Sequence, residues 1–259
     1  MPSVACVLAP NPGPMTLSGT NTWVVGDPAL GPVVVVDPGP ADEGHLGRVL
    51  DVAGDVSTVV LTHRHLDHSE GAAAFAGRAG CGVRAVDPAW RVGTEGLEDG
   101  TVLQAAGVRL EVVATPGHTS DSVSLLATYD DQAAPGPDLL TGDTVLGFGS
   151  TVITFPDGDL GDYLASLDRL LALVSARGVV RILPGHGPVV ADPHAVLTGY
   201  RQHRRERLAQ VRAALAAGAR TPEEVLAVVY PDSVGTPIEG AAAQAVRAQL
   251  DHLEAHRRR

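Results

Sequence analysis

The most informative short stretch of the chain is Thr62-His63-Arg64-His65-Leu66-Asp67-His68. It supplies three imidazoles and one carboxylate, which are the usual protein ligands of zinc and related first-row ions. Four such groups this close together cannot all bind one tetrahedral ion that also keeps a water, so the spacing favours two metals. The apolar residues before the stretch indicate a buried strand, and strand ends are where rigid scaffolds present chemistry. We therefore expect a metal site where this strand ends.

Three further candidate ligands also follow predicted strands. They are His118, Asp143 and His186, and a glycine precedes each of them. Glycine permits the tight backbone turn that aims the next side chain into a shared cleft. A lone histidine after a strand is more often an ordinary surface or core residue. Three residues in the same local context, added to the stretch 62–68, favour one common site.

Short β-branched runs recur through the first three quarters of the chain and are separated by Gly and Pro. They predict strands at 22–25, 33–37, 57–62, 83–86, 108–115, 122–127, 138–141 and 179–183. Apolar residues at helical spacing predict helices at about 42–53, 68–79 and 161–176. This mixture indicates an α/β protein with layered packing, in which sheets lie inside and helices outside.

The character of the chain changes at Pro193. The chain of 259 residues is 44% hydrophobic and 19% charged, which suits one large domain or one domain with a small appendage. Beyond Pro193 the strand signals fade, and helices are expected at about 193–217, 222–230 and 238–256. We therefore divide the chain into a catalytic domain, 1–192, and a small C-terminal helical domain, 193–259.

The composition indicates a cytoplasmic protein. The start of the chain lacks the basic and apolar segments of a signal peptide, and no run approaches the ~20 apolar residues of a membrane span. The two cysteines, Cys6 and Cys81, lie far apart in the sequence, which fits reduced thiols better than a disulfide framework. We expect no membrane partner, and the sequence carries no signal of an oligomeric state.

The charge is unevenly distributed along the chain. The formal net charge is −11, and every fixed positive charge is an arginine. Residues 1–192 hold 9 Arg and 23 acidic residues, whereas residues 193–259 hold 10 Arg and 7 acidic residues. Coding bias in a GC-rich genome accounts for the missing lysines. The mildly basic C-terminal segment is also compatible with contacts to an anionic substrate.

Taken in order, the candidate ligands resemble the metallo-β-lactamase superfamily, and the match covers residues of about 15–190. The resemblance implies an αββα sandwich with a dinuclear site at one edge. It implies one metal held by His63, His65 and His118, a second held by Asp67, His68 and His186, and Asp143 bridging the two together with a water or hydroxide. Zinc suits these nitrogen and oxygen ligands, and manganese or iron would also fit.

The same resemblance implies hydrolysis by a metal-bound hydroxide, because metals lower the pKa of bound water to roughly 7. Asp67 would orient this nucleophile and accept its proton. Asp37, at the end of an apolar strand, matches the early Asp of the superfamily, which orients ligands from behind. A plain turn at the end of a strand is an alternative interpretation of Asp37. Secreted β-lactamases commonly carry Cys where this chain has Asp143, so antibiotic resistance is not the expected role.

Three other segments resemble a narrower group, the β-lactamase-like protein 2 family. They are residues 11–22, the motif Gly117-His118-Thr119-Ser120-Asp121, and a helix with Tyr200, His203, Arg204 and Arg207, followed by a region resembling a winged helix. That family includes metal-dependent endoribonucleases that act on single-stranded RNA. Related fungal proteins instead hydrolyse polyketide thiolesters on carrier proteins.

Three functions therefore stay open. For RNA cleavage, His203, Arg204 and Arg207 would contact phosphates and Asn21 would border the cleft, although the acidic 1–192 segment and 3% aromatic content argue against it. Hydrolysis of a thiolester or another activated ester is the second function, since glyoxalase II-type enzymes share all seven ligands. A catalytically silent binding protein comes last, because such a protein is expected to have lost ligands.

Overall fold

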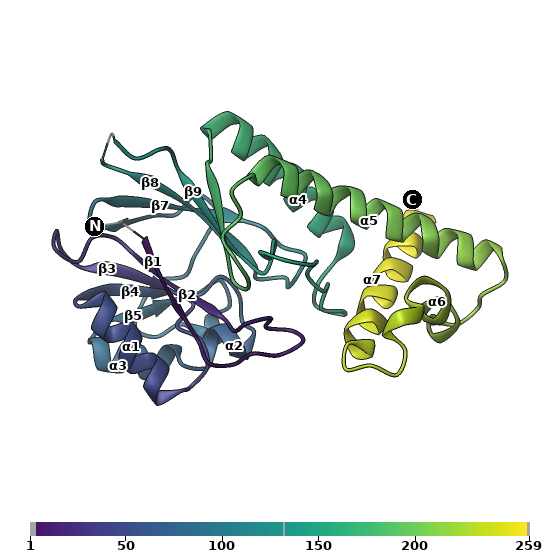
Figure 1. Cartoon of the computed structure of the whole chain (residues 1–259), viewed down its shortest axis with the longest axis horizontal. Helices are drawn as coiled ribbons and strands as arrows, with labels where there is room; N and C mark the ends of the chain where they lie inside the picture. Colours follow the sequence, from purple (N-terminus) through teal and green to yellow (C-terminus); the bar gives the residue numbers. More distant parts are fainter. Residues whose placement is uncertain (1–3, 132, 258–259) are drawn as a thin grey trace.

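The computed structural model describes residues 4–131 and 133–257, and two five-stranded sheets form its centre (Figure 1). In the first sheet the strand order is β1 (Val4–Leu8), β2 (Asn21–Val25), β3 (Val33–Val36), β4 (Val56–Val60) and β5 (Gly82–Arg84). In the second it is β10 (Arg181–Pro184), β9 (Asp138–Gly142), β8 (Val123–Tyr129), β7 (Val108–Ala114) and β6 (Val102–Ala105). Each sheet is mixed: β3–β4, β4–β5 and β9–β10 pair in parallel, and the other neighbours pair antiparallel.

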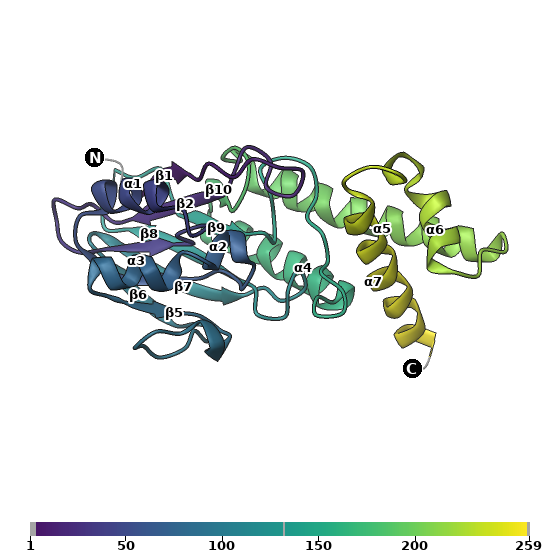
Figure 2. The same cartoon turned by 90° about the horizontal axis from the view of Figure 1, so that it is seen from below.

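Helices cover the outer faces of both sheets, as Figure 2 shows. The helices are α1 (Glu43–Ala53), α2 (Leu66–Ser69), α3 (Ala72–Ala79), α4 (Leu160–Arg177), α5 (Pro193–Ala216), α6 (Pro222–Val229) and α7 (Glu239–Arg257), with short 3-10 turns at Pro88–Trp90 and Pro231–Ser233. Helices α1 and α3 pack on the first sheet, and α4 packs on the second. The expected αββα layering is therefore confirmed. Among the described residues, none of the helices combines the length and apolar character that crossing a membrane requires.

The strand β3 shows how the layers are built. Its four valines are all fully buried, because the strand has a covered face on each side. Val33 and Val35 pack under α1 and α3, whereas Val34 and Val36 face the second sheet. Side chains alternate between the two faces of a strand, so one apolar run serves two cores.

Each strand predicted from the sequence is present, with ends displaced by one or two residues. Strands β1 and β6 were missed, because both are short edge strands with partly exposed side chains. The single helix expected at 68–79 is two helices, α2 and α3, which are separated at Glu70 and Gly71. A Cβ on Gly71 would come within 2.8 Å of the Pro40 carbonyl oxygen, so the backbone at Gly71 lies too close to Pro40 for a side chain.

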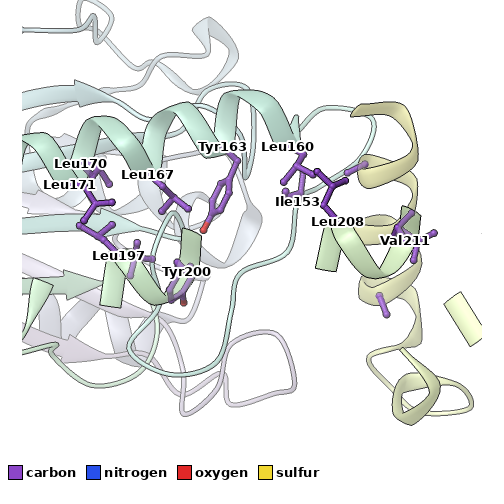
Figure 3. Close-up of a cluster of buried hydrophobic side chains, with 14 of the residues drawn as sticks. Ile153, Leu160, Tyr163, Leu167, Leu170, Leu171, Leu197, Tyr200, Leu208 and Val211 are labelled. Carbon is purple, nitrogen blue, oxygen red and sulfur yellow. The ribbon is translucent and has the colours of Figure 1, made fainter. Parts of the chain in front are cut away.

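The C-terminal helices share a hydrophobic core with α4 (Figure 3). Leu197 and Tyr200 of α5 pack toward Leu167 and Leu171 of α4, and Leu208 lies further along α5, nearer α7. This cluster continues into α6 and α7, so the apolar contacts cross residue 193 without a break. The division at 192/193 stays a prediction. Within the described residues 193–257 there is no strand, so only the helical part of the winged-helix resemblance is seen.

Candidate metal centre

All seven predicted ligands lie together at one edge of the sandwich, beyond the ends of four strands. They are His63 and His65 in the loop after β4, Asp67 and His68 in α2, and His118, Asp143 and His186 after β7, β9 and β10. Five of them are buried, whereas His65 and Asp67 are partly exposed. The cluster is therefore enclosed by the protein on most sides and open beside these two residues.

The first group consists of His63, His65 and His118. The distance from His65 Nδ1 is 3.1 Å to His63 Nε2 and 3.0 Å to His118 Nε2. Two nitrogens bound to one tetrahedral zinc ion are about 3.3 Å apart, given Zn–N bonds of about 2.0–2.1 Å. The spacing of these three nitrogens therefore suits one common cation.

The partners behind these rings decide which nitrogens carry protons. His118 Nδ1 donates to the Val152 carbonyl oxygen at 2.5 Å, so its Nε2 has a free lone pair. Thr62 donates its hydroxyl proton to Asp37 Oδ2 at 2.6 Å, so the same hydroxyl accepts from His63 Nδ1 at 3.1 Å. Both Nε2 atoms then face His65 without a proton of their own. Such a convergence of lone pairs is what a cation requires.

The second group consists of Asp67, His68 and His186. His186 Nε2 lies 3.2 Å from His68 Nε2 and 3.1 Å from Asp67 Oδ2, and the third side of the triangle is 3.4 Å. His186 Nδ1 is 3.1 Å from the Gly19 carbonyl oxygen and donates to it, which leaves Nε2 as the free nitrogen. The two triads are thus separate groups, each able to hold a metal ion.

Asp143 lies between the two groups. Its Oδ1 is 3.4 Å from His68 Nε2, and its Oδ2 is 3.5 Å from His186 Nε2 and 3.8 Å from His118 Nε2. Oδ1 is buried and has no hydrogen-bond partner, which is costly for a carboxylate unless a cation binds it. A Cβ on Gly185 would come within 2.5 Å of this oxygen, so glycine before His186 leaves space for the carboxylate. The donor set therefore fits two cations with Asp143 between them.

The electrostatics of the two groups differ. Burial lowers the pKa of His118 to about 4 and holds the pKa of His63 well below its ordinary value, so both rings are neutral at pH 7. Burial is also the largest single effect on His68 and His186 and lowers their pKa values, but the neighbouring carboxylates, Asp143 first, together outweigh it, so the pKa of His68 is well above its ordinary value and that of His186 is about 9. The second group therefore favours a positive charge. A bound divalent cation would supply that charge.

Asp37 supports the cluster from behind. Its Oδ1 accepts from the Thr62 backbone N–H at 2.7 Å, and its Oδ2 accepts from the Thr62 hydroxyl and from His68 Nδ1 at 2.9 Å. Its backbone has a φ of 52°, a left-handed conformation that is uncommon outside glycine and typical of functional sites. Since both oxygens are engaged by protein donors, the geometry supports an orienting role rather than direct metal binding.

We expect Asp37→Asn to lower the affinity for metal about 10- to 100-fold, because partners that orient metal-binding histidines typically contribute that much. Competition with a chromogenic chelator measures this affinity. Asp51→Asn is the matched control, since Asp51 is exposed on α1, a helix that carries none of the ligands. Equal affinities of the Asp37 variant and the control would contradict the orienting role.

Two of the predicted substrate contacts have internal partners instead. Asn21 donates through Nδ2 to the carbonyl oxygens of Pro184 and Gly187, at 3.0 and 2.8 Å. It therefore fixes the loop that carries His186 and lies outside the cavity lining. Arg207 donates to the Val229 carbonyl oxygen at 2.9 Å and stacks on the Tyr230 ring at 4.8 Å, so it fastens α6 to α5.

Arg204 is also an internal residue, with 3% of its surface exposed. Its guanidinium donates to the Thr151 carbonyl oxygen and lies 5.0 Å from the centre of the Tyr163 ring. Thr151 Oγ1 is in turn 3.2 Å from His118 Nδ1. The sequence alone could not reveal this contact, because it joins segments that are about fifty residues apart. His203 is half-buried and does line the cavity.

A cavity of about 750 Å³ opens beside the cluster. His65, Asp67, His118 and Asp143 line one end of it. The other end is lined by residues of α7 and of the segment before it. Its volume is in the range of sites that bind small molecules and cofactors.

Several residues that position the site gave no signal in the sequence. Thr62 and the carbonyl of Val152 fix histidine tautomers, and Arg64 pairs with Asp157 at 2.6 Å. Tyr163 donates to the Thr144 carbonyl oxygen at 2.6 Å, directly after Asp143. Each contact joins segments that are distant in the sequence, except that of Thr62 with its neighbour, so residue spacing could not indicate them.

The αββα sandwich thus carries a histidine triad and a His/Asp triad at one edge, with the carboxylate of Asp143 between them. The model of the Metallo-beta-lactamase superfamily matches residues 15–186. The chain belongs to this superfamily. Members of the superfamily generally bind divalent metals, in accordance with the donor set described above.

The chain is similar to several curated proteins. Lactamase-like protein adaB of Aspergillus niger is 33% identical over 218 residues, which make up 82% of this chain and 64% of adaB, so the chain spans less than two thirds of that relative. A Beta-lactamase-like protein 2 homolog of Drosophila melanogaster is 32% identical, over 97% of this chain and 88% of its own length. Atrochrysone carboxyl ACP thioesterase of Aspergillus fumigatus is 31% identical, over 88% and 74%.

Solved structures support the fold over almost the whole chain. A metallo-beta-lactamase family protein from Thermus thermophilus has a TM-score of 0.79 and 24% identity, over 99% of this chain and 94% of that chain. A beta-lactamase domain protein from Burkholderia ambifaria has a TM-score of 0.80 and 20% identity, over 99% and 87%. The match includes the C-terminal helices, because it covers nearly all residues of this chain.

Proposed function

We propose that the protein hydrolyses an acyl thioester with two divalent metal ions bound at the His/Asp cluster. One observation carries the proposal: two separate triads of donor atoms lie with Asp143 between them, and His65, Asp67, His118 and Asp143 of this cluster line the end of a largely apolar cavity. A relative named as an acyl carrier thioesterase is 31% identical over most of the chain. Zinc is the first candidate metal, and manganese or iron are alternatives.

Divalent ions bound at these groups would lower the pKa of a coordinated water to about 7 and polarise the thioester carbonyl. Asp67 is the residue placed to accept the proton of the attacking water. Its side chain is 29% exposed and lines the cavity, and its Oδ2 accepts a weak hydrogen bond from Thr20 Oγ1 at 3.4 Å. Although burial opposes ionisation, His68 and His186 lower the pKa of Asp67, so it is a carboxylate at neutral pH. Asp67 can therefore orient a water molecule and take its proton.

Cleavage of single-stranded RNA is the competing function, and the contacts of the arginines disfavour it. Arg204 and Arg207 both donate to backbone carbonyl oxygens of the protein, and Arg204 is buried. The chain as a whole has a net charge of −11, which repels a polyanion. An acyl thioester needs no such basic surface.

A substrate panel on the metal-loaded protein tests the proposal. We expect turnover of acyl thioesters and none of fluorescent single-stranded RNA. Asp67→Ala is expected to reduce thioester turnover at least about 100-fold, since a positioned general base typically contributes that much. Cleavage of RNA that disappears in Asp67→Ala would overturn the thioester proposal in favour of the nuclease. Metal-loaded protein that turns over neither substrate would overturn it in favour of a silent binding protein.

A further inference from the structure

The cavity beside the cluster has walls from three distant parts of the chain. The N-terminal loop contributes Met15 and Leu17, and the segment after Asp143 contributes Leu146, Phe148 and Val152. The far wall belongs to α7 and the residue before it, with Ile238, Gly240, Ala241, Ala242 and Ala245. The ligand cluster and the C-terminal helix therefore face one another across a single space.

The opening of this cavity is unusually apolar for a protein surface. Phe148 is 73% exposed, Met15 is 50% exposed, and Ile238 is 44% exposed. All three line the same cavity, and each comes from a different wall. Exposed apolar side chains that gather around one opening mark a binding site rather than a chance distribution.

We propose that this space, the acyl cavity, binds a long apolar acyl group and that the small side chains of α7 set the longest group accepted. The inference rests on the proposed thioester hydrolysis. With the scissile carbonyl at the His/Asp cluster, one side of the thioester must enter the cavity. Natural thiol carriers bear amides and phosphates, which an apolar lining does not satisfy, whereas an apolar acyl chain gains from each buried methylene. A long aliphatic acyl group is the matching class.

The position of α7 makes chain length testable. Ala241 lines the cavity near the start of α7 and has only a methyl side chain. Ala241→Trp places an indole in that space without altering any residue of the His/Asp cluster. Ala255→Trp is the matched control, because Ala255 is an exposed alanine of the same helix outside the cavity lining.

The experiment measures kcat/KM for N-acetylcysteamine thioesters from acetyl to decanoyl. Each buried methylene is worth up to about fourfold, so we expect a rise of at least about 100-fold from acetyl to decanoyl in the unaltered protein. In Ala241→Trp the decanoyl value is expected to fall at least about tenfold while the acetyl value stays within about twofold. In Ala255→Trp both values should be unchanged. A flat length profile, or an equal fall for both substrates in Ala241→Trp, would overturn the inference and leave thioester hydrolysis standing.

Binding separates the inference from the proposed function. Ketone analogues, in which CH₂ replaces the thioester sulfur, cannot be hydrolysed, and their affinities can be measured by calorimetry. If no thioester is turned over but ketone affinity rises with chain length and falls in Ala241→Trp, the proposed function fails and the acyl cavity stands. Ketone affinities that do not change with chain length would exclude the acyl cavity, whether or not thioesters are turned over.

Discussion

Asp143→Ala is expected to abolish thioester hydrolysis, with a loss in kcat/KM of at least about 1000-fold, because it removes the carboxylate on which both metal groups depend. The oxygens of Asp143 lie 3.4–3.8 Å from ring nitrogens of His68, His118 and His186. Even partners that only orient a ligand are worth about 10- to 100-fold in metal affinity, so loss of the central carboxylate should cost more. Metal analysis of the purified variant should therefore show fewer than two bound ions.

The control for this variant is Asp130→Ala, which removes an exposed carboxylate at the other end of the sandwich. It should retain two metals and full turnover. Circular dichroism of both variants shows whether the fold is kept. An Asp143→Ala protein that is folded and active within about tenfold of the unaltered chain would contradict the arrangement of two metals around Asp143.

Arg204→Met is expected to lower the free energy of unfolding by about 2–4 kcal/mol, since a charged hydrogen bond and a buried cation–π contact are lost together. Arg204 connects α5 to the Thr151 carbonyl oxygen, and Thr151 and Val152 contact His118 Nδ1. The loss should therefore extend to metal affinity, because the orientation of His118 depends on this segment. Denaturant unfolding and chelator competition measure the two effects.

Arg205→Met is the matched control, because Arg205 is the exposed neighbour of Arg204 on α5. It should leave both quantities unchanged. A phosphate-binding Arg204 would behave differently: Arg204→Met would keep the stability and the metal affinity, and would weaken RNA binding and flatten its salt dependence. That pattern would contradict the positioning role.

Much of the fold was predictable from local sequence. The β-branched run of β3 is buried on both faces, so its apolar character is continuous and easy to recognise. The edge strands β1 and β6 were not predictable in this way, because partly exposed strands carry a weaker pattern. The separation of α2 from α3 at Gly71 depends on a contact with Pro40, which is distant in the sequence.

In the candidate site, too, some features could be predicted from local sequence and others depend on contacts between distant segments. The ligand positions could be predicted, because metal chemistry restricts residue type and each ligand lies at the end of a strand. The substrate residues stay predictions, because an arginine on a helix looks the same in sequence whether it faces solvent or a backbone carbonyl. Arg204 and Arg207 face carbonyl oxygens, and Asn21 holds the His186 loop. The apolar opening at Met15, Phe148 and Ile238 joins three segments that only the fold brings together.

The most direct test of a two-metal thioester hydrolase is a titration of the metal-free protein with zinc, in which bound metal and the rate of thioester hydrolysis are followed together. We predict that the metal-free protein is inactive and that two equivalents of zinc bind. The rate should reach its maximum only as the second group fills. A protein that hydrolyses the thioester equally well after exhaustive chelation, or that gains nothing when zinc binds, would contradict this mechanism.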